Sequence, residues 1–433
     1  MTVLPTYPDS NQVSDMAKLR RHLHMNPELS WLEFQTTAFL CRQLEKLGYT
    51  IRWGSDLYAD LRPHNLPPSD QLDAAYQRAE TNLGKDNKYL PKMEGGLTGL
   101  VATINGADNG PVFGFRLDID ALPIDEQEVD GHLPGDGGFV STNPGVMHAC
   151  GHDAHMAIGL GLAKKIAESK DKLKGKVHLF FQPAEEIGGG GVLFADLPEL
   201  QEVDKFMTLH IGINNERRLI CDATWVAAKV FDVRFSGRAS HAGNSPQEGR
   251  NALLAACQAV QGLYALPRHG AGASRVNVGR FFSENANNVV ADDARFRFEV
   301  RGANNEICDQ MADGARRTIE GAALMNECTT VVDAFSEFSF QPNSPSMVAE
   351  IEKAAISLGL DEQVLSKPKQ IPASEDAGYL IQAVQQRGGQ AAHIILGCPV
   401  RGGHHNSLFD IDEDVMGWGV DLMAAVISNS EST

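Results

Sequence analysis

Apolar positions in the first half of the chain recur with alternating helix-like and strand-like spacing. Residues 15–47 have a helical pattern that Asn26-Pro27 divides into two helices, and residues 49–53 have a strand-like pattern. Further strands are predicted at residues 97–104, 111–117, 176–182 and 206–210, and a further helix at 153–168. Because strands and helices alternate along the chain, we predict an α/β fold with a mixed sheet flanked by helices.

Residues 55–95 interrupt this pattern. The stretch is polar and contains several prolines, and only residues 69–83 have the spacing of a helix. We therefore predict that residues 55–95 form an insertion on a compact domain.

Residues 229–337 have a pattern of their own. Strands are predicted at 229–236, 274–282, 293–301 and 328–335, and helices at 249–266 and 306–325. The order β-α-β-β-α-β is that of a ferredoxin-like unit. Helix and strand signals then resume at 348–358, 376–386, 393–396 and 415–426. We predict a discontinuous α/β domain of residues 1–224 and 338–433 that carries an inserted α+β domain at 225–337.

Composition narrows the class of protein. The 433 residues include 38 Lys and Arg against 56 Asp and Glu, a formal net charge of −18. Such an acidic chain is a poor candidate for binding nucleic acid or an anionic membrane. No apolar run is long enough to span a bilayer, and residues 1–30 do not resemble a signal peptide. Seven scattered cysteines indicate reduced thiols and a cytoplasmic location.

Two dense motifs contain residues that can bind metal. Cys150 and His152 lie two residues apart at a glycine-bearing turn that precedes a predicted helix, and thiolate and imidazole both suit zinc. Glu185 and Glu186 follow the predicted strand 176–182, at the strand end where α/β sheets form ligand sites. One carboxylate of such a pair can bind metal while the other carries a catalytic proton. Each motif alone also fits a turn without a ligand.

Two histidine signals change this balance. His210 ends a predicted apolar strand, and His404-His405 follows two glycines near the C-terminus. A single histidine at a strand end is more often structural, but four such signals at comparable positions are not. One glutamate and one of the terminal histidines, with Cys150, His152 and His210, make about five ligands, which suits two metal ions better than one tetrahedral ion.

Weaker candidates surround these motifs. Asp120, at the end of a predicted strand, can orient a ligating histidine from behind. His241 can donate to a developing oxyanion, and Arg301 can bind a carboxylate through two parallel hydrogen bonds. For each of these residues alone, a structural role is the more common one.

Taken together, the motifs resemble the M20 metallopeptidase family, and within it the amidohydrolase branch that carries His-Ala-Cys-Gly-His-Asp. The resemblance extends over nearly the whole chain and rests on the following segments: Arg20-Arg21-His22-Leu23-His24 with Pro27-Glu28, His148–Asp153, and His405-Asn406-Ser407-Leu408-Phe409-Asp410. It implies a two-metal hydrolase with a catalytic domain and a lid domain, residues 225–337, that also forms a dimer. The Glu-rich segment that ends in four glycines and the acyl side of the substrate pocket depart from the family pattern or cannot be matched residue by residue.

The resemblance also assigns roles by motif match. The implied metal ligands are Cys150, His152, Glu186, His210 and His405. Glu185 matches the general base and Asp120 the acid that orients the site. His241 matches a lid histidine that reaches into a partner's active site, and Asn288 and Arg301 match residues that hold the substrate's free carboxylate. Asp118 stands where many relatives have a metal-binding histidine and is left out of the ligand set.

We expect the protein to bind two divalent metal ions, manganese or zinc, and to hydrolyse the amide bond of an N-acyl amino acid. The first candidate substrate is p-aminobenzoyl-glutamate, and indole-acetyl-aspartate or another N-acyl amino acid is the alternative. We expect a homodimer, or a heterodimer with a homologous sister chain. A non-catalytic metal-binding protein is the competing hypothesis from another class.

Overall fold

The computed structural model describes residues 10–59, 61–365 and 367–430, which fold as two compact units. Unit 1 comprises Met1–Thr224, Gln341–Gln370 and Asp376–Thr433, and unit 2 comprises Trp225–Phe340 and Ile371–Glu375. Residues 1–9 and 431–433 of the predicted α/β domain lie outside the described residues. None of the described helices is long and apolar enough to cross a membrane.

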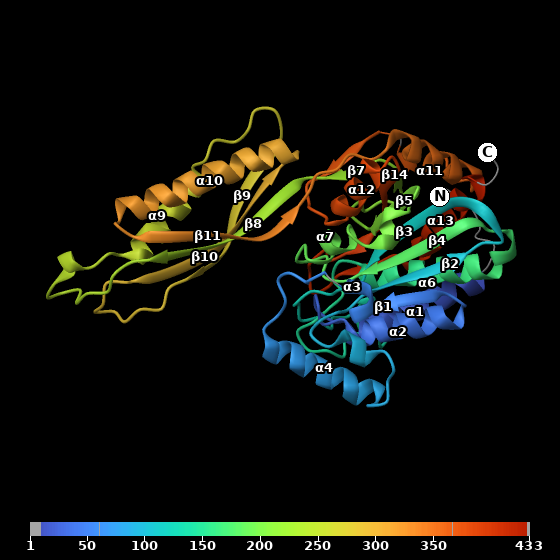
Figure 1. The fold of residues 1–433 in the computed structure, drawn as a ribbon, viewed down its shortest axis with the longest axis horizontal. Coiled ribbons are helices and arrows are strands. Elements are labelled where there is room, and N and C mark those ends of the chain that lie inside the picture. The colour runs from blue at the N-terminus through green and yellow to red at the C-terminus, as the bar shows by residue number, and fades with distance from the viewer. Residues whose placement is uncertain (1–9, 60, 366, 431–433) are drawn as a thin grey trace. The chain divides into compact units, whose positions relative to one another are not determined.

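Unit 1 is built on an eight-stranded mixed sheet, as the sequence predicts (Figure 1). Its four central strands, in the order β4-β3-β5-β14, are parallel, whereas β1 and β2 pair antiparallel at one side. In sheet order the strands are β1 (Thr50–Trp53), β2 (Leu100–Asn105), β4 (Lys174–Gln182), β3 (Asp108–Asp118), β5 (Lys205–Ile211), β14 (Gln390–Leu396), β6 (Leu219–Ile220) and β12 (Val364–Leu365). Four further short strands are β7 (Ala223–Trp225), β13 (Lys369–Ile371), β15 (Val400–Arg401) and β16 (Asp410–Ile411).

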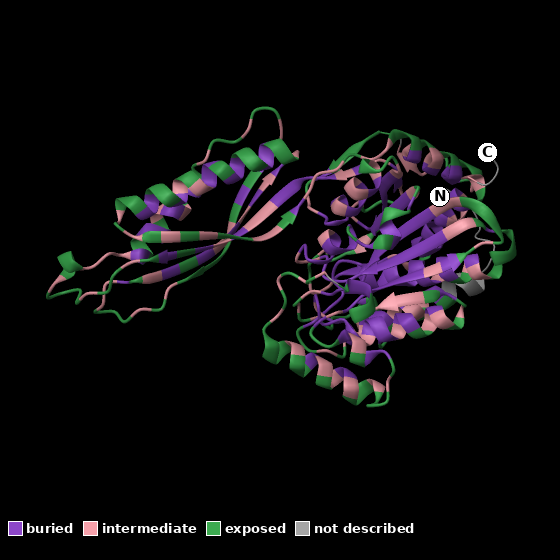
Figure 2. Cartoon of the chain, viewed as in Figure 1, coloured by how far each residue is buried: buried purple, intermediate pink, exposed green. Residues whose placement is uncertain are grey.

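Helices cover both faces of this sheet, because alternate strand residues point to opposite faces. Phe113, Phe115 and Leu117 of β3 pack in the larger core, whereas Phe180 of β4 and Phe206 of β5 pack in the smaller one. The larger core contains residues of α1 (Ser10–Met25), α2 (Phe34–Lys46), α6 (His152–Glu168), α11 (Pro345–Ser357) and α13 (Met416–Ser430). The smaller contains residues of α7 (Gly190–Phe194), α8 (Pro198–Gln201) and α12 (Ala377–Gln386). Figure 2 shows the central strands buried between these layers.

The predicted insertion at residues 55–95 packs against unit 1 more closely than its polarity indicates. It contains the expected helix α4 (Ser69–Leu83), and also the short helix α3 (Ser55–Tyr58) and the 3-10 turn Leu90–Met93. Ala79 and Met93 are fully buried in the larger core. The helical stripe of small residues was too short to reveal this packing in the sequence.

Unit 2 has the β-α-β-β-α-β order that its sequence predicts. Its elements are β8 (Ala227–Ser236), α9 (Ala252–Tyr264), β9 (Ser274–Phe282), β10 (Asp293–Gly302), α10 (Asn305–Met325) and β11 (Thr329–Phe338). The strands form an antiparallel sheet in the order β11-β8-β10-β9. Phe231, Val233 and Phe235 of β8 pack with both helices in one core, so α9 and α10 cover one face of the sheet (Figure 1). The side chains of Asn251 and Asn304 cap the two helices.

Candidate metal centre

The candidate ligands gather where the four parallel strands of unit 1 end. Strand β3 ends at Asp118, opposite Gln182 at the end of β4, and His210 in β5 is opposite Ile395 in β14. The Glu185-Glu186 pair follows β4 directly, and the His404-His405 pair follows β14 through a longer loop. Carboxyl ends of adjacent parallel strands share one edge of the sheet, so residues far apart in sequence converge there.

The N-terminus of α6 brings the remaining two candidates to the same edge. Gly151, between Cys150 and His152, has φ +99°, and a Cβ at this position would lie 2.5 Å from Cγ2 of Ile211. Glycine is therefore required on both conformational and steric grounds. The turn that it permits places Cys150 Sγ 3.4 Å from Nε2 of His210.

Hydrogen bonds orient two of the histidines for metal binding. Nδ1 of His152 lies 2.8 Å from the carbonyl oxygen of Asp120, and Nδ1 of His210 lies 2.8 Å from that of Ile211. A carbonyl only accepts, so each Nδ1 carries the proton and each Nε2 keeps its lone pair. Burial holds the pKa of His210 well below its ordinary value, so its imidazole is neutral.

The five donors form two overlapping sets. Cys150, His152 and His210 offer ligand atoms within 4.8 Å of one another, and so do Cys150, Glu186 and His405. His405 Nε2 lies 3.5 Å from Glu186 Oε2, and His152 Nε2 lies 3.8 Å from Glu186 Oε1. The structure thus brings together all five residues that the sequence motifs suggested, with Cys150 common to both sets.

The residues fit a metal ion on an observation of the structure itself. Nε2 of His152 and Oε1 of Glu186 are buried and have no hydrogen-bond partner among the described residues, which is costly unless a ligand satisfies them. Burial raises the pKa of Glu186 to about 8. Burial alone would lower the pKa of His152, but Asp118 and Asp120 raise it to about 10. The cluster therefore favours positive charge, and sulfur, nitrogen and oxygen donors together suit a divalent transition metal.

Asp120 holds the Glu185-Glu186 turn in place. Its Oδ1 accepts from the Glu185 amide at 3.1 Å, and its Oδ2 accepts from the Glu186 amide at 3.0 Å and from Ser30 Oγ at 2.7 Å. Ala184, just before the pair, has φ +55°, so the turn is strained for a residue with a Cβ. The Asp120 side chain is thus a positioning group, and its main-chain carbonyl orients His152.

A buried network lies beneath the site and was not recognised from the sequence. Arg116 Nη1 donates to Asp118 at 2.7 Å, and Arg116 Nη2 donates to Asp376 at 2.8 Å. His155 Nε2 accepts from the Ile211 amide, so its Nδ1 carries the proton and donates to Asp118 at 2.5 Å. Asp118 Oδ2 still lies 3.7 Å from His152 Nε2. A charged residue inside an otherwise apolar strand, as Arg116 is in β3, was the available sequence signal.

The two terminal histidines have different surroundings. His404 Nε2 accepts from the Ile213 amide at 3.0 Å, and burial lowers the pKa of His404 to about 4. His405 has φ +57° and a side chain that is 55% exposed. Since a backbone amide already occupies Nε2 of His404, His405 is the histidine of this pair that belongs to the candidate ligand sets.

The three candidates in unit 2 do not form one cluster within the chain. His241 Nδ1 accepts from the amides of Gly243 and Asn244 at 3.1 and 3.0 Å, so its Nε2 carries the proton and is a donor. The Asn288 carbonyl accepts from the Ala242 amide at 2.9 Å, which keeps Asn288 beside His241.

Arg301 lies at the other end of the same sheet. Asn288 precedes the start of β10 and Arg301 is near its end, eight residues after Asp293, or about 26 Å at the strand rise. The guanidinium of Arg301 makes two hydrogen bonds to Glu299, at 2.9 and 3.0 Å. One chain therefore does not bring Asn288 and Arg301 to the same carboxylate.

The mixed α/β sheet and the buried donor set at its strand ends define the class of a metal-dependent hydrolase. The model of Peptidase family M20/M25/M40 matches residues 114–429, and the chain belongs to this family. Indole-3-acetyl-aspartic acid hydrolase of Enterobacter agglomerans is 39% identical over 96% of this chain and 95% of its own. One of the chains named for the p-aminobenzoyl-glutamate hydrolase of Escherichia coli K12 is 37% identical over 95% of this chain and 94% of its own.

Solved structures agree with this assignment. An aminobenzoyl-glutamate utilization protein from Klebsiella pneumoniae superimposes with a TM-score of 0.78 and 34% identity, over 97% of this chain and 96% of its own. A dinuclear metal-binding peptidase of the M20 family from Bacillus subtilis superimposes with a TM-score of 0.69 and 25% identity, over 98% and 100%. The protein is an enzyme of this hydrolase family, and the family supports a requirement for divalent metal.

Proposed function

We propose that the protein hydrolyses the amide bond between an aromatic acyl group and an amino acid. The observation that carries this proposal is the set of five convergent donors, Cys150, His152, Glu186, His210 and His405, beside a further buried carboxylate, Glu185. The relatives that are 37–39% identical over almost the whole chain carry the names of hydrolases of such conjugates, which supports it.

These five residues would hold two divalent ions, manganese or zinc. Cys150 belongs to both sets of three donors, so a thiolate shared between the two ions is our preferred arrangement. When bound, such ions supply Lewis acidity, which lowers the pKa of water and polarises a carbonyl group.

Glu185 is our candidate for the general base. Its Oε2 lies 3.9 Å from His152 Nε2, so the carboxylate borders the ligand sets. Amide hydrolysis needs a group that takes a proton from water and delivers it to the leaving nitrogen, and a carboxylate held beside the reacting atoms does both. Asp120 fixes this carboxylate through the Glu185 amide.

His241 and Arg301 are our candidates for contacts that the lid supplies. The Nε2 of His241 is a donor, which is the state needed to stabilise the oxyanion of a tetrahedral intermediate. Arg301 has the planar fork that matches a free α-carboxylate, and Glu299 holds that fork in one orientation. Because Asn288 lies beside His241 and far from Arg301, we propose that His241 and Asn288 serve the site of a partner copy.

We propose p-aminobenzoyl-glutamate as the substrate, with indole-acetyl-aspartate as the second candidate, because each has a named relative. The test loads the full chain with Mn²⁺ or Zn²⁺, adds each conjugate, and follows release of the free aromatic acid by chromatography. A chelated sample and the Glu185→Gln protein are the controls. Release that needs metal and Glu185 is expected; no release of either acid at any metal loading would contradict the proposed substrate class.

We also propose that residues 225–337 form the lid and the dimer contact, in a homodimer or with a homologous sister chain, inside the cytoplasm. The Escherichia coli relative is named as one subunit of its hydrolase, which supports the heteromeric form, and the scattered cysteines support the compartment. Static light scattering of the purified chain distinguishes a dimer from a monomer. Metal uptake without any hydrolysis would favour a non-catalytic metal-binding protein instead.

A further inference from the structure

The outer face of the unit 2 sheet, opposite α9 and α10, is rich in arginine. Phe296 and Phe298 of β10 belong to the core beneath the helices, so the alternating residues Arg295 and Arg297 point to the other face. Arg234 on β8 and Arg280 on β9 pair with them and share that face. Unit 2 has a net charge of −2, whereas the rest of the chain has −16, so this face is a basic region in an acidic protein.

The arginines stand directly opposite one another on neighbouring strands. The register pairs Arg234 with Arg295 across β8 and β10, and Arg280 with Arg297 across β9 and β10. Directly opposed side chains have Cβ atoms about 5 Å apart, and like charges in this position destabilise a sheet. Two such pairs side by side are unfavourable unless anions lie between the guanidinium groups.

One pair already has such an anion within the chain. The carboxylate of Asp293 accepts from Arg234 Nε at 2.6 Å and from Arg295 Nε at 3.0 Å. In the other pair, Arg297 makes two hydrogen bonds to Asp232 and lies 3.5 Å above the ring of Phe335. Arg280 makes no hydrogen bond or ion pair with any residue that the structure describes, so this pair has a guanidinium without a counter-charge.

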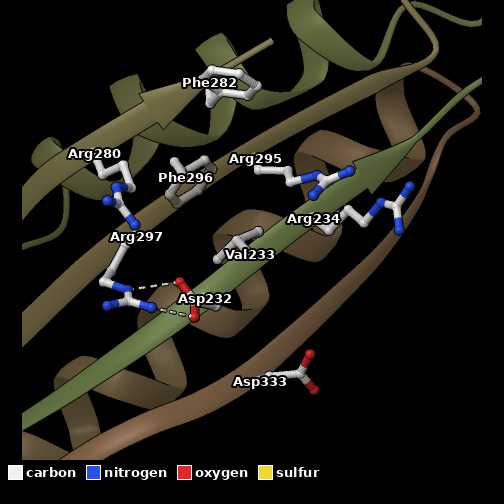
Figure 3. A pocket seen from close by; sticks show the side chains of 9 residues that line it. All are labelled: Asp232, Val233, Arg234, Arg280, Phe282, Arg295, Phe296, Arg297 and Asp333. Atoms are coloured by element: carbon white, nitrogen blue, oxygen red, sulfur yellow. Dashed lines mark hydrogen bonds and ion pairs between the residues drawn. The ribbon is translucent and has the colours of Figure 1, made fainter. Parts of the chain in front are cut away.

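A pocket of about 530 Å³ opens beside Arg280 (Figure 3). Its lining includes Arg280, Arg295 and Arg297, together with Phe282, which lies two residues beyond Arg280 on β9 and is 53% exposed. A neighbouring pocket of about 320 Å³ shares Arg280 and Arg297. The ladder between β9 and β10 shifts register between Arg297 and Phe298, and this irregularity lies beside Arg280.

We propose that this pocket binds a small aryl carboxylate. The carboxylate lies between Arg280 and Arg297, as that of Asp293 lies between Arg234 and Arg295, and the aromatic ring packs on Phe282. A guanidinium presents two parallel N–H groups that match a carboxylate, and aromatic rings stack favourably in offset geometry. Asp232 and Asp333 in the lining disfavour a phosphate, because its second negative charge would face two acids.

Arginine-selective labelling tests the site on the metal-loaded full-length protein. Phenylglyoxal modifies exposed guanidinium groups, and peptide mass spectrometry reports the labelling rate at each arginine separately. We expect millimolar benzoate to slow labelling of Arg280, while acetate, which lacks the ring, requires a higher concentration. Arg268, an exposed arginine in the loop before β9, serves as the internal control and keeps its labelling rate.

Two variants separate the carboxylate contact from the ring contact. Calorimetry should show that Arg280→Gln weakens benzoate binding about tenfold or more, and that Arg268→Gln, with the same loss of charge, leaves it unchanged. Phe282→Ala should remove the preference for benzoate over acetate, with Arg280 still protected. Equal protection of Arg268, no protection of Arg280, or equal affinity in the Arg280→Gln protein would each overturn the proposal. None of these measurements requires turnover, so they are independent of the proposed reaction.

Discussion

Asp120→Asn tests whether the support beneath the metal site controls its function. The wild-type carboxylate accepts three hydrogen bonds, from the amides of Glu185 and Glu186 and from Ser30 Oγ, and the side chain is almost fully buried. An asparagine keeps one acceptor oxygen and turns an NH₂ group toward an amide N–H. One charge-assisted hydrogen bond is lost and one buried amide is left without an acceptor.

The cost follows from that count. A hydrogen bond to a charged group contributes about 1.5–3 kcal/mol, so we expect Asp120→Asn to lower the free energy of unfolding by about 2–3 kcal/mol. The same change releases the Glu185-Glu186 turn, and loss of such support behind a metal ligand weakens metal affinity or activity by about 10- to 100-fold. The Asp120 carbonyl that orients His152 belongs to the backbone and stays in place.

The assay combines urea unfolding, calorimetric metal titration and kcat at saturating metal. Ser30→Ala is the matched control, because it removes the hydroxyl contact alone and leaves both amide contacts; we expect a loss of about 1 kcal/mol or less and nearly unchanged kcat. If Asp120→Asn keeps wild-type metal affinity and kcat while losing stability, the side chain supports only the fold, and its assignment as a positioning residue is refuted.

Three further predictions concern the chemistry of the site. Glu185→Gln should reduce kcat by several orders of magnitude with metal content unchanged, measured by product release and elemental analysis; more than a few per cent of residual activity would remove Glu185 from the role of base. Arg301→Ala should raise KM for a substrate with a free α-carboxylate more than it lowers kcat, whereas Arg275→Ala, its cross-strand neighbour, should change neither. The metal-free protein should lose stability as pH rises, because the folded-state pKa values of His152, about 10, and Glu186, about 8, exceed the ordinary values of 6.5 and 4.5. The unfolded chain then binds fewer protons than the folded one, so the proton-linked stability, complete below about pH 4.5, declines up to about pH 10; metal loading, which replaces these protons, should flatten the urea-midpoint profile, and identical profiles with and without metal would contradict the ligand assignment.

The main elements of the fold followed from apolar periodicity. The strand at 274–282 and the helix at 69–83 coincide with β9 and α4, because both segments have clear spacing and recognisable ends. The short strands β6 and β12 have two residues each and no periodicity to detect. They exist only because β14 and its neighbours offer them open hydrogen-bonding groups.

Local sequence also determined much of the candidate site. The Cys150–His152 spacing, the paired glutamates after an apolar strand and the glycines before His404 are short-range features with direct chemical meaning. Sequence alone left His404 and His405 as alternatives. The tertiary structure distinguished them, since the Ile213 amide occupies Nε2 of His404.

Only the tertiary structure revealed how charge is arranged around these motifs. The contacts of Arg116 with Asp118 and Asp376 span up to 260 residues, and the facing arginines of unit 2 arise from strand register. Periodicity reports which face of an element is buried, because burial depends on each residue's own polarity. Which charges meet depends on the pairing of distant segments, and that pairing is set by packing of the whole chain.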